Sequence, residues 1–309
     1  MKSEINKKIM EKIKCNLCGA DDYKVICPAR YDMVKQQELA DKFRSSGDEL
    51  LVDQLVKCNE CGFMYLNPRI KPQLILKGYS EGTDENFISQ AKYRELTFSK
   101  ALRHIERFTK GKKGRIYDIG TAGGSFLNAA KKRGWDVYGS EPNKWLCKWG
   151  KENYGITIWQ GDIFSHRFEK NFFDVVTLWD VLEHVPDPSK NLEEINRILK
   201  PGGILVVNYP DISSWISKLM GKKWIFLLSV HLFYFNRKTI KKMLNKNGFK
   251  AIKIKPHFQT LSLGYLAFRT KSYSKLLYKI GMPIIKALHM ENLQIPYWLG
   301  QTLVIARKE

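Results

Sequence analysis

The chain has 309 residues, and its 52 Lys and Arg outnumber its 31 Asp and Glu, which gives a formal net charge of +21 at pH 7. This length suffices for one large domain and a small one, and six cysteines do not suggest a disulfide scaffold. Residues 1–14 contain no apolar segment of the signal-peptide kind, and the longest nearly continuous apolar run, residues 224–235, is too short to cross a bilayer. We therefore expect a cytoplasmic protein.

Two copies of the pattern Cys-x-x-Cys-Gly, at residues 15–19 and 58–62, mark the first part of the chain. Two thiolates at this spacing can bind one metal ion from a tight turn, and the glycine permits the backbone conformation that the turn needs. Two such turns complete the closed tetrahedral site of a structural zinc ion. We therefore interpret residues 1–75 as a zinc-ribbon module, with a metal-free or redox-active cysteine cluster as the alternative. The expected ligands are Cys15, Cys18, Cys58 and Cys61.

One helix is predicted within this module and another after it. Residues 33–56, between the cysteine pairs, are polar and helical in composition, and residues 88–109 have the apolar spacing of an amphipathic helix. We assign residues 76–110 to a connecting helical segment that leads into a larger domain over residues 111–309.

A strand that ends in a carboxylate opens the larger domain. The strand is predicted over residues 115–119, a loop of small residues follows, and a helical pattern begins at Phe126. Such a unit is typical of a βαβ fold in which the loop backbone approaches a ligand. Asp118 at the mouth of the loop disfavours a pyrophosphate because like charges repel, so a cationic ligand with ribose hydroxyls, such as S-adenosylmethionine, fits better. The expected contacts of this loop are Asp118, Gly120, Ala122 and Gly124.

Further strand ends carry acidic residues at the expected distances. A second short strand ends at Glu141, 23 positions after Asp118, where a carboxylate can accept both hydroxyls of a ribose. A third strand over residues 156–159 precedes Asp162, a fourth covers residues 172–179, and a fifth covers residues 204–208. In content and order these motifs resemble the class I S-adenosylmethionine-dependent methyltransferases, from about residue 88 to the C-terminus.

The resemblance implies an α/β fold with a Rossmann-like seven-stranded class I methyltransferase sheet, closed by an antiparallel pair over residues 249–258 and 300–306. It also implies that Asp118 and its loop hold the methionine end of the cofactor, that Glu141 binds the ribose, and that Asp162 contacts adenine. Ala122 stands where a glycine is usual, and we expect its methyl group to alter the cofactor fit slightly without loss of binding. A cysteine module ahead of such a domain resembles bacterial sugar and surface-glycan methyltransferases, in which the ribbon covers the substrate side.

The end of the fourth strand carries the candidate reaction site. Its Leu-Glu-His-Val motif resembles a subgroup that includes the ubiquinone-pathway O-methyltransferases. Asp180, Glu183 and His184 stand at i, i+3 and i+4, so a helical turn would place them on one face. There they could hold Mg²⁺, which would lower the pKa of an acceptor hydroxyl. Alternatively His184 is a general base, or Glu183 and His184 only cap a turn. Asp180 is also expected among the cofactor contacts.

His231 is a second catalytic candidate. It lies among aromatic residues after the fifth strand, and the resemblance places a similar segment over the acceptor. A histidine packed in the core is the alternative. The catalytic candidates are thus His184, Glu183 and His231.

Residues 260–299 form a long basic insert between the last two strands. One helical face is predicted to be apolar, and Pro283 should kink or divide the helix. Residues 212–290 contain 16 Lys and Arg and no Asp or Glu. The predicted apolar face comprises Leu277, Ile280, Ile284 and Leu288, and the lysines that project away from it are Lys271, Lys275, Lys279 and Lys286.

We expect methyl transfer to a small-molecule, sugar or lipid-linked glycan acceptor, most readily at oxygen. The basic insert favours peripheral contact with an anionic membrane at its inner face, with solvated lysines as the alternative. A second hypothesis is an RNA methyltransferase that binds nucleic acid through the ribbon and the basic C-terminal half. No Asn-Pro-Pro-Tyr tetrapeptide of the base-binding type follows the fourth strand, which weighs against a base amine as acceptor.

Overall fold

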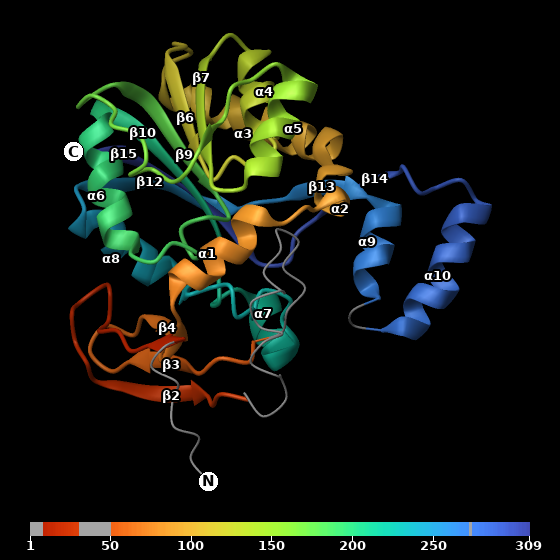
Figure 1. Ribbon diagram of the computed structural model, residues 1–309, viewed down its shortest axis with the longest axis horizontal. Coiled ribbons are helices and arrows are strands. Elements are labelled where there is room, and N and C mark those ends of the chain that lie inside the picture. Colours follow the sequence, from red (N-terminus) through yellow and green to blue (C-terminus); the bar gives the residue numbers. More distant parts are fainter. Residues whose placement is uncertain (1–8, 31–50, 272–273) are drawn as a thin grey trace.

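The computed structural model describes residues 9–30, 51–271 and 274–309, and within them the main body is a seven-stranded sheet (Figure 1). β-Branched and aromatic side chains on the central strands are buried from both faces, as expected for a sheet covered by helices on both sides. The strands in sheet order are β12 (Phe249–Pro256), β15 (Gln301–Lys308), β10 (Leu199–Pro210), β9 (Phe173–Trp179), β6 (Arg115–Ile119), β7 (Asp136–Glu141) and β8 (Trp159–Gln160).

The sheet order changes direction at β6. β6 pairs in parallel with β7 on one side and β9 on the other, while β15 runs antiparallel to both β10 and β12. In open α/β sheets a ligand binds at the carboxyl ends of the strands where the order reverses. The predicted Rossmann-like sheet and its antiparallel closing pair are confirmed, and the cofactor loop leaves β6 at this reversal point.

Helices cover both faces of the sheet (Figure 1). On the α3 side, Leu102 and Ile105 pack with Phe126 and Leu127 of α4, and on the other side α8 buries Met243 and Leu244. Burial of such side chains is the main source of stability for the layers, at about 1.5–3 kcal/mol per large apolar side chain. The helices on one face are α3 (Ala91–Phe108), α4 (Ser125–Lys131) and α5 (Lys144–Tyr154), and those on the other are α6 (Pro188–Ile198) and α8 (Arg237–Lys246).

A small four-stranded sheet lies below the main body in Figure 1, with α1 (Pro72–Glu81) between them. Three of its strands come from the N-terminal part of the chain, and the fourth comes from far along the sequence. Buried Phe63 stacks on Phe233 of β11 with ring centroids 5.6 Å apart, and both belong to the same apolar core as Val176 and Leu205 of the main sheet. The strand order is β11 (Phe233–Tyr234), β4 (Met64–Leu66), β3 (Leu55–Cys58) and β2 (Tyr23–Cys27), beside a separate pair of β1 (Met10–Glu11) and β5 (Arg69–Ile70).

Several predicted elements differ in extent from the structure. The helix over residues 88–109 begins later, as α3, after the short α2 (Glu85–Ile88). The third strand, predicted over residues 156–159, is only Trp159–Gln160, because Ile156 and Ile158 are buried outside the ladder. Residues 33–50 of the predicted helix 33–56 lie outside the described residues, and its last two residues belong to strand β3.

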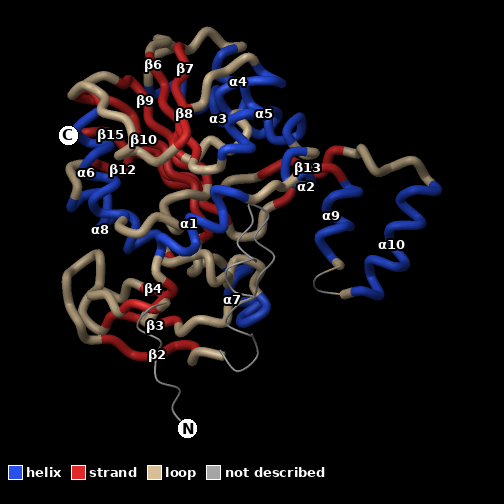
Figure 2. The backbone as a smooth tube through the Cα atoms, in the orientation of Figure 1, coloured by secondary structure: helices blue, strands red, loops and turns tan. Residues whose placement is uncertain are grey.

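The C-terminal insert is a helical hairpin that projects away from the body (Figure 2). A two-stranded stem of β13 (Gln259–Ser262) and β14 (Gln294–Tyr297) carries α9 (Leu263–Thr270) and α10 (Lys275–Ala287). α10 is not divided at Pro283, which lies inside the helix. Within the described residues, no helix combines the length and apolarity needed to span a membrane. The remaining helices are α7 (Trp215–Met220) and a 3-10 turn at Gly221–Lys223.

Candidate active site

The loop after β6 adopts left-handed backbone conformations that favour glycine. The φ angles are +64° at Gly120, +50° at Ala122 and +80° at Gly124. A Cβ on Gly120 would lie 2.8 Å from Cγ2 of Val181, so the loop is in contact with the chain that follows β9. At Ala122, where a glycine is usual, the left-handed backbone conformation is unfavourable for any residue with a side chain. This conformational cost matters more than the volume of the added methyl group.

Gly123 is a loop residue that sequence reasoning missed. A Cβ there would lie 2.7 Å from Cδ1 of Ile88 and 2.8 Å from Cε3 of Trp149. Two helices thus close directly on the loop backbone, and only glycine fits between them. The consecutive glycines at positions 123 and 124 were the available signal in the sequence.

Asp118 lies at the carboxyl end of β6, buried between the neighbouring strands. Thr177 of β9 donates a hydrogen bond from Oγ1 to Oδ1 of Asp118 at 2.5 Å. Burial raises the pKa of Asp118 to about 7, and the negative charge of Glu141 adds to the rise. Within the described part of the chain, no cation is among the groups that shift the pKa of this carboxyl, and a ligand ammonium or sulfonium would stabilise its charged form.

Glu141 ends β7 and is also buried, and it organises the loop. Its Oε2 accepts the amide N–H of Ala122 at 2.8 Å, and its Oε1 accepts that of Asn143 at 2.9 Å. The side chain of Tyr79 adds a further hydrogen bond to this carboxyl, although burial still raises its pKa to about 7. Asn143 holds the end of α1 in turn, donating to the Tyr79 carbonyl at 2.6 Å. Tyr79 was not predicted, since it comes from a separate helix.

Asp162 follows β8 at the same edge and is exposed. The preceding Gly161 donates its N–H to the Glu141 carbonyl at 3.0 Å, which brings this turn beside the end of β7. Oδ1 of Asp162 accepts the amide N–H groups of Phe164 and Ser165, both at 3.0 Å. The structure therefore places the predicted adenine-side residue next to the predicted ribose-side residue.

Asp180 lies at the end of β9 but does not join Glu183 and His184. The residues after β9 form an irregular turn, with φ +54° at Asp180, so the predicted helical face of these three residues is wrong. Asp180 instead accepts hydrogen bonds from Nδ2 of Asn208 at 2.7 Å and from Nε2 of Gln259 at 3.2 Å. Its pKa rises to about 6 because of burial, despite the nearby positive charge of Arg94.

Arg94 and Gln259 are site residues that sequence reasoning missed. Arg94 belongs to α3 and lies over the ring of Phe87 at 3.9 Å from the centroid. Gln259 begins the stem of the C-terminal hairpin and also accepts the hydroxyl of Tyr297 at 2.7 Å. No local pattern marks these residues, because only the tertiary fold brings them to the end of β9.

Glu183, His184 and His231 form a compact buried cluster. One nitrogen or oxygen of each lies within 4.8 Å of the others, and the two imidazole rings are 4.6 Å apart between centroids. Glu183 is 1% exposed, and among the described residues neither of its carboxyl oxygens has a hydrogen-bond partner. His184 is the half-buried member. The structure thus unites the three catalytic candidates, which lie on two segments far apart in the sequence.

Backbone carbonyls fix both histidine rings. Nδ1 of His184 lies 2.9 Å from the Val230 carbonyl, and Nδ1 of His231 lies 2.8 Å from the Phe226 carbonyl. A carbonyl only accepts, so each Nδ1 carries the proton and each neutral ring keeps its lone pair at Nε2. Burial lowers the pKa of His184 to about 4 and that of His231 well below its ordinary value.

The same burial raises the pKa of Glu183 well above its ordinary value, and the nearby Asp180 charge raises it further. Burial thus favours the neutral form of all three groups in the protein alone. The segment that carries His231 is held over the turn by a hydrogen bond from the Phe233 N–H to the Glu183 carbonyl at 3.1 Å. The cluster therefore lies at the turn whose Val181 contacts the loop after β6.

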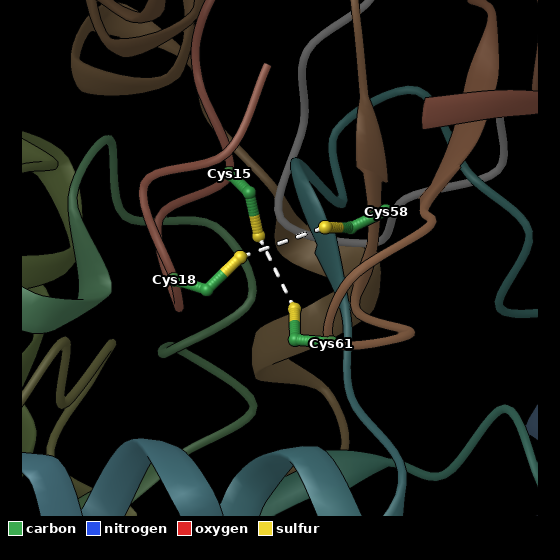
Figure 3. A group of neighbouring side chains, drawn as sticks. All are labelled: Cys15, Cys18, Cys58 and Cys61. Carbon is green, nitrogen blue, oxygen red and sulfur yellow. Dashed lines mark hydrogen bonds between the residues drawn. The ribbon is translucent and has the colours of Figure 1, made fainter. Parts of the chain in front are cut away.

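The four predicted metal ligands converge at one point (Figure 3). Sγ of Cys15 lies 3.5 Å from that of Cys61, and Sγ of Cys18 lies 3.5 Å from that of Cys58. The two turns are alike. In each, the glycine has a left-handed φ and donates its N–H to the carbonyl of the first cysteine, at 2.7 Å in one turn and 3.0 Å in the other. Four thiols in this geometry fit a tetrahedral divalent ion. Burial raises the pKa of Cys15 to about 11, and metal binding would displace that proton.

Comparison with known proteins agrees with the fold. Residues 93–254, more than half of the chain, match a family described as a methyltransferase domain. The chain belongs to this methyltransferase family. The matched region contains the cofactor loop, Glu141, Asp162 and the buried cluster.

Two relatives of this methyltransferase chain illustrate the range of the family. Phosphoethanolamine N-methyltransferase 2 of Caenorhabditis elegans is 29% identical over 198 residues, which is 58% of this chain and 42% of that protein. Ubiquinone biosynthesis O-methyltransferase of Coxiella burnetii is 27% identical over 134 residues, which is 41% of this chain and 57% of that protein. The chain thus spans about half the length of these relatives.

A solved structure supports the fold. The SAM-dependent methyltransferase from Archaeoglobus fulgidus aligns with a TM-score of 0.50 and 20% identity, over 73% of this chain and 100% of that one. At this identity the likeness concerns the fold of the methyltransferase domain alone.

Proposed function

We propose that the protein transfers the methyl group of S-adenosylmethionine to an oxygen of a small molecule, a sugar or a lipid-linked glycan. The observation that carries this proposal is the buried cluster of Glu183, His184 and His231, which lies at the turn after β9 whose Val181 contacts the cofactor loop. Family membership supports methyl transfer, and a relative named for O-methylation supports oxygen as the acceptor atom.

The residues at the sheet reversal fit the cofactor. Asp118 would face its positively charged methionine end, and Glu141 would accept its ribose hydroxyls, which compete with the amides that Glu141 now binds. Asp162, on the exposed turn beside Glu141, would lie toward adenine. When bound, the cofactor supplies an activated methyl group on a sulfonium, so the protein need only position the acceptor and take up its proton.

His184 is the proposed general base. It is the half-buried member of the cluster, and its Nε2 lone pair is free to take the hydroxyl proton of the acceptor. The charges balance, because the positive charge that leaves the sulfonium reappears on the imidazole. A Glu183 carboxylate in the same cluster would stabilise this imidazolium, and His231 packs edge-on against the His184 ring.

A divalent cation, if the reaction uses one, would be held by Glu183, His184 and His231. Asp180 of the predicted magnesium set is bonded elsewhere, to Asn208 and Gln259. A set of two imidazoles and one carboxylate suits Zn²⁺, Fe²⁺ or Mn²⁺ better than Mg²⁺, which prefers oxygen ligands. We propose a structural zinc ion at the separate cluster of four cysteines.

The test is cofactor binding followed by turnover. We expect S-adenosylmethionine to bind in calorimetry, and release of S-adenosylhomocysteine to require a phenol, sugar or glycan acceptor. His184→Gln should lose about 10²–10⁴-fold in turnover and keep its cofactor affinity. His104→Gln, which changes a histidine of α3 outside the cluster, is the matched control. Absence of cofactor binding would refute the proposal, and turnover on RNA alone would replace it with the nucleic-acid alternative.

A further inference from the structure

The hairpin of α9 and α10 leaves a wide apolar surface without a partner in the described residues. α10 contains no buried residue. Its bare apolar side chains lie on successive turns of one face and are between 54% and 67% exposed: Leu276, Leu277, Ile280, Ile284 and Leu288. Soluble chains seldom leave so many large apolar side chains together in water without a partner.

A different side of α10 packs against α9, so this apolar face stays exposed. Tyr278, Met282 and Ile285 are half-buried and form the side that packs against α9, where Phe268 and Tyr278 have ring centroids 6.4 Å apart. Lys271, predicted to join the basic stripe, instead lies over the ring of Tyr278 at 5.7 Å and closes the hairpin. The apolar face therefore points away from α9, and packing within the hairpin cannot cover it.

Exposed lysines occupy the side of α10 opposite its bare apolar face. At about 100° per residue, Lys275, Lys279 and Lys286 fall together roughly half a turn from Ile284. No acidic residue lies between positions 212 and 290, so neither α9 nor α10 carries an acid that could pair with these lysines, and Glu291 follows after the end of α10. A helix with lysines on its polar face and bare leucine and isoleucine on the other matches the pattern of helices that lie in a membrane interface.

A second exposed apolar group lies at the base of the hairpin stem. Trp298 follows β14 and has ring centroids 5.9 Å from Trp215 of α7 and 6.4 Å from Phe258, which precedes β13. Trp215 and Phe258 are 64% and 61% exposed. Tryptophan is enriched at the headgroup level of bilayers, and lysines there are attracted to anionic headgroups. α7 carries Lys218, and the turn after it carries Lys222 and Lys223.

We infer that the α9–α10 hairpin is an arm that docks the protein on an anionic lipid surface. Charge favours a membrane over a second copy of this chain, because a symmetric contact through α10 would bring two acid-free, lysine-rich segments together. The stem of the arm carries Gln259, which binds Asp180 at the end of β9, so docking would set the acceptor side of the active site near the lipid. The inference concerns binding and does not depend on which acceptor is methylated.

Vesicle sedimentation with the full chain tests the arm. We expect binding to phosphatidylglycerol-containing vesicles and none to pure phosphatidylcholine vesicles, with loss of binding between about 0.1 M and 1 M salt, where the Debye length falls from about 10 Å to 3 Å. The triple variant of Lys275, Lys279 and Lys286 to Gln should weaken partitioning roughly ten- to hundredfold, since each lysine near such a surface contributes about 1 kcal/mol.

Two further variants distinguish binding through the α9–α10 hairpin from binding caused by the net positive charge of the protein. Ile280→Gln with Ile284→Gln should abolish vesicle binding and leave cofactor affinity unchanged, because neither side chain is buried. The matched control changes three exposed lysines of α8, a basic helix whose apolar face is already covered, and should bind vesicles nearly as well as wild type. That control comprises Lys238→Gln, Lys241→Gln and Lys242→Gln.

Three outcomes would overturn the inference. The first is absence of binding to anionic vesicles, including the case in which the protein binds RNA with a steep salt dependence. The second is an equal loss in the α8 control, which would make net charge the sole cause. The third is a stable dimer that the Ile280 and Ile284 double variant dissociates, which would make a second copy the occupant of the face.

Discussion

Two buried carboxyls, Asp118 and Glu141, dominate the site at the scale of single residues. Each lies at the end of a strand, is almost fully buried, and has a pKa raised to about 7 by burial. Folding therefore places two acids in positions that disfavour their charged forms until a cationic ligand arrives. Both residues were predictable from the sequence because each belongs to a short local motif, a strand that ends in an acid before a turn.

Replacement of Glu141 should weaken cofactor binding. Glu141→Ala removes the acceptor for the ribose hydroxyls and frees the amides of Ala122 and Asn143, so we expect a loss of about 1.5–3 kcal/mol in S-adenosylmethionine affinity by calorimetry. Glu169→Ala, at an exposed acid far from the loop, is the control. Unchanged affinity in Glu141→Ala would show that this carboxyl does not bind the cofactor.

Cofactor affinity should also depend on pH through Asp118. Its pKa of about 7 means that the carboxyl is largely protonated at pH 6, and a cationic ligand must displace that proton. Affinity should therefore rise as pH increases from 5 to about 7 and level off above it. Calorimetry across this range should show that Asp118→Asn binds weakly at every pH and has a shallower slope, with the remainder due to Glu141, whose pKa is also raised to about 7. A slope as steep as that of the wild type would contradict the assignment.

Some residues of the site carry no such local signal. Tyr79 of α1 is hydrogen-bonded to Glu141 at the end of β7. Arg94 of α3 and Gln259 of the hairpin stem lie near Asp180 at the end of β9. His231 was a candidate, but its contact with Glu183 and His184 depends on the fold of an irregular segment. The helical face expected for Asp180, Glu183 and His184 was wrong because a left-handed residue breaks the turn.

At the scale of elements, α3 ties the connecting segment to the sheet. Glu106 near its end binds Arg133 through Nε at 2.9 Å, Trp135 through Nε1 at 3.3 Å, and Lys113. The hydrogen bond from Arg133 lowers the pKa of Glu106 to about 2. Helix periodicity predicted α3 well, whereas this polar junction joins residues from three elements and could not be read from any one of them.

The Glu106 junction should stabilise the fold in a pH-dependent way. Because the folded pKa is below that of the unfolded chain, about 4.3, the contribution is present above that pH and disappears as pH falls toward 2. Glu106→Gln should lower the free energy of unfolding by about 2 kcal/mol at pH 7, and the difference from wild type should shrink on acidification. Urea unfolding gives both values. Glu152→Gln, in an exposed pair with Lys148 at 3.7 Å, is the control and should change little.

At the scale of the whole molecule, hydrogen bonds connect the cysteine module to the methyltransferase domain close to the turn after β9. Asn16, between the first two cysteines, donates to Oδ1 of Asp187 at 2.8 Å and accepts the Ser189 N–H at 3.1 Å, both at the start of α6. Arg69 reaches the Pro186 carbonyl at 3.1 Å. The turn that bears Glu183 and His184 therefore rests on the module, a contact that sequence motifs alone could not predict.

Loss of the proposed metal ion should therefore also reduce methyl transfer. Cys58→Ser should abolish bound zinc in elemental analysis, loosen the module, and reduce turnover, while S-adenosylmethionine affinity stays close to wild type because Asp118 and Glu141 lie on the other sheet. Cys27→Ser, outside the cluster, is the matched control. Wild-type protein prepared without chelators that contained no zinc would contradict the metal assignment.

The small sheet also constrains how the chain can be made. β4 ends at Leu66, but its neighbour β11 begins at Phe233, so the module sheet cannot be completed until that later segment has left the ribosome. At about 5–20 residues per second, the first strands wait roughly ten to thirty seconds for this partner. During that interval the four cysteines are already synthesised. A bound metal ion would hold the two cysteine turns together until Phe233 and its aromatic neighbours pack against them.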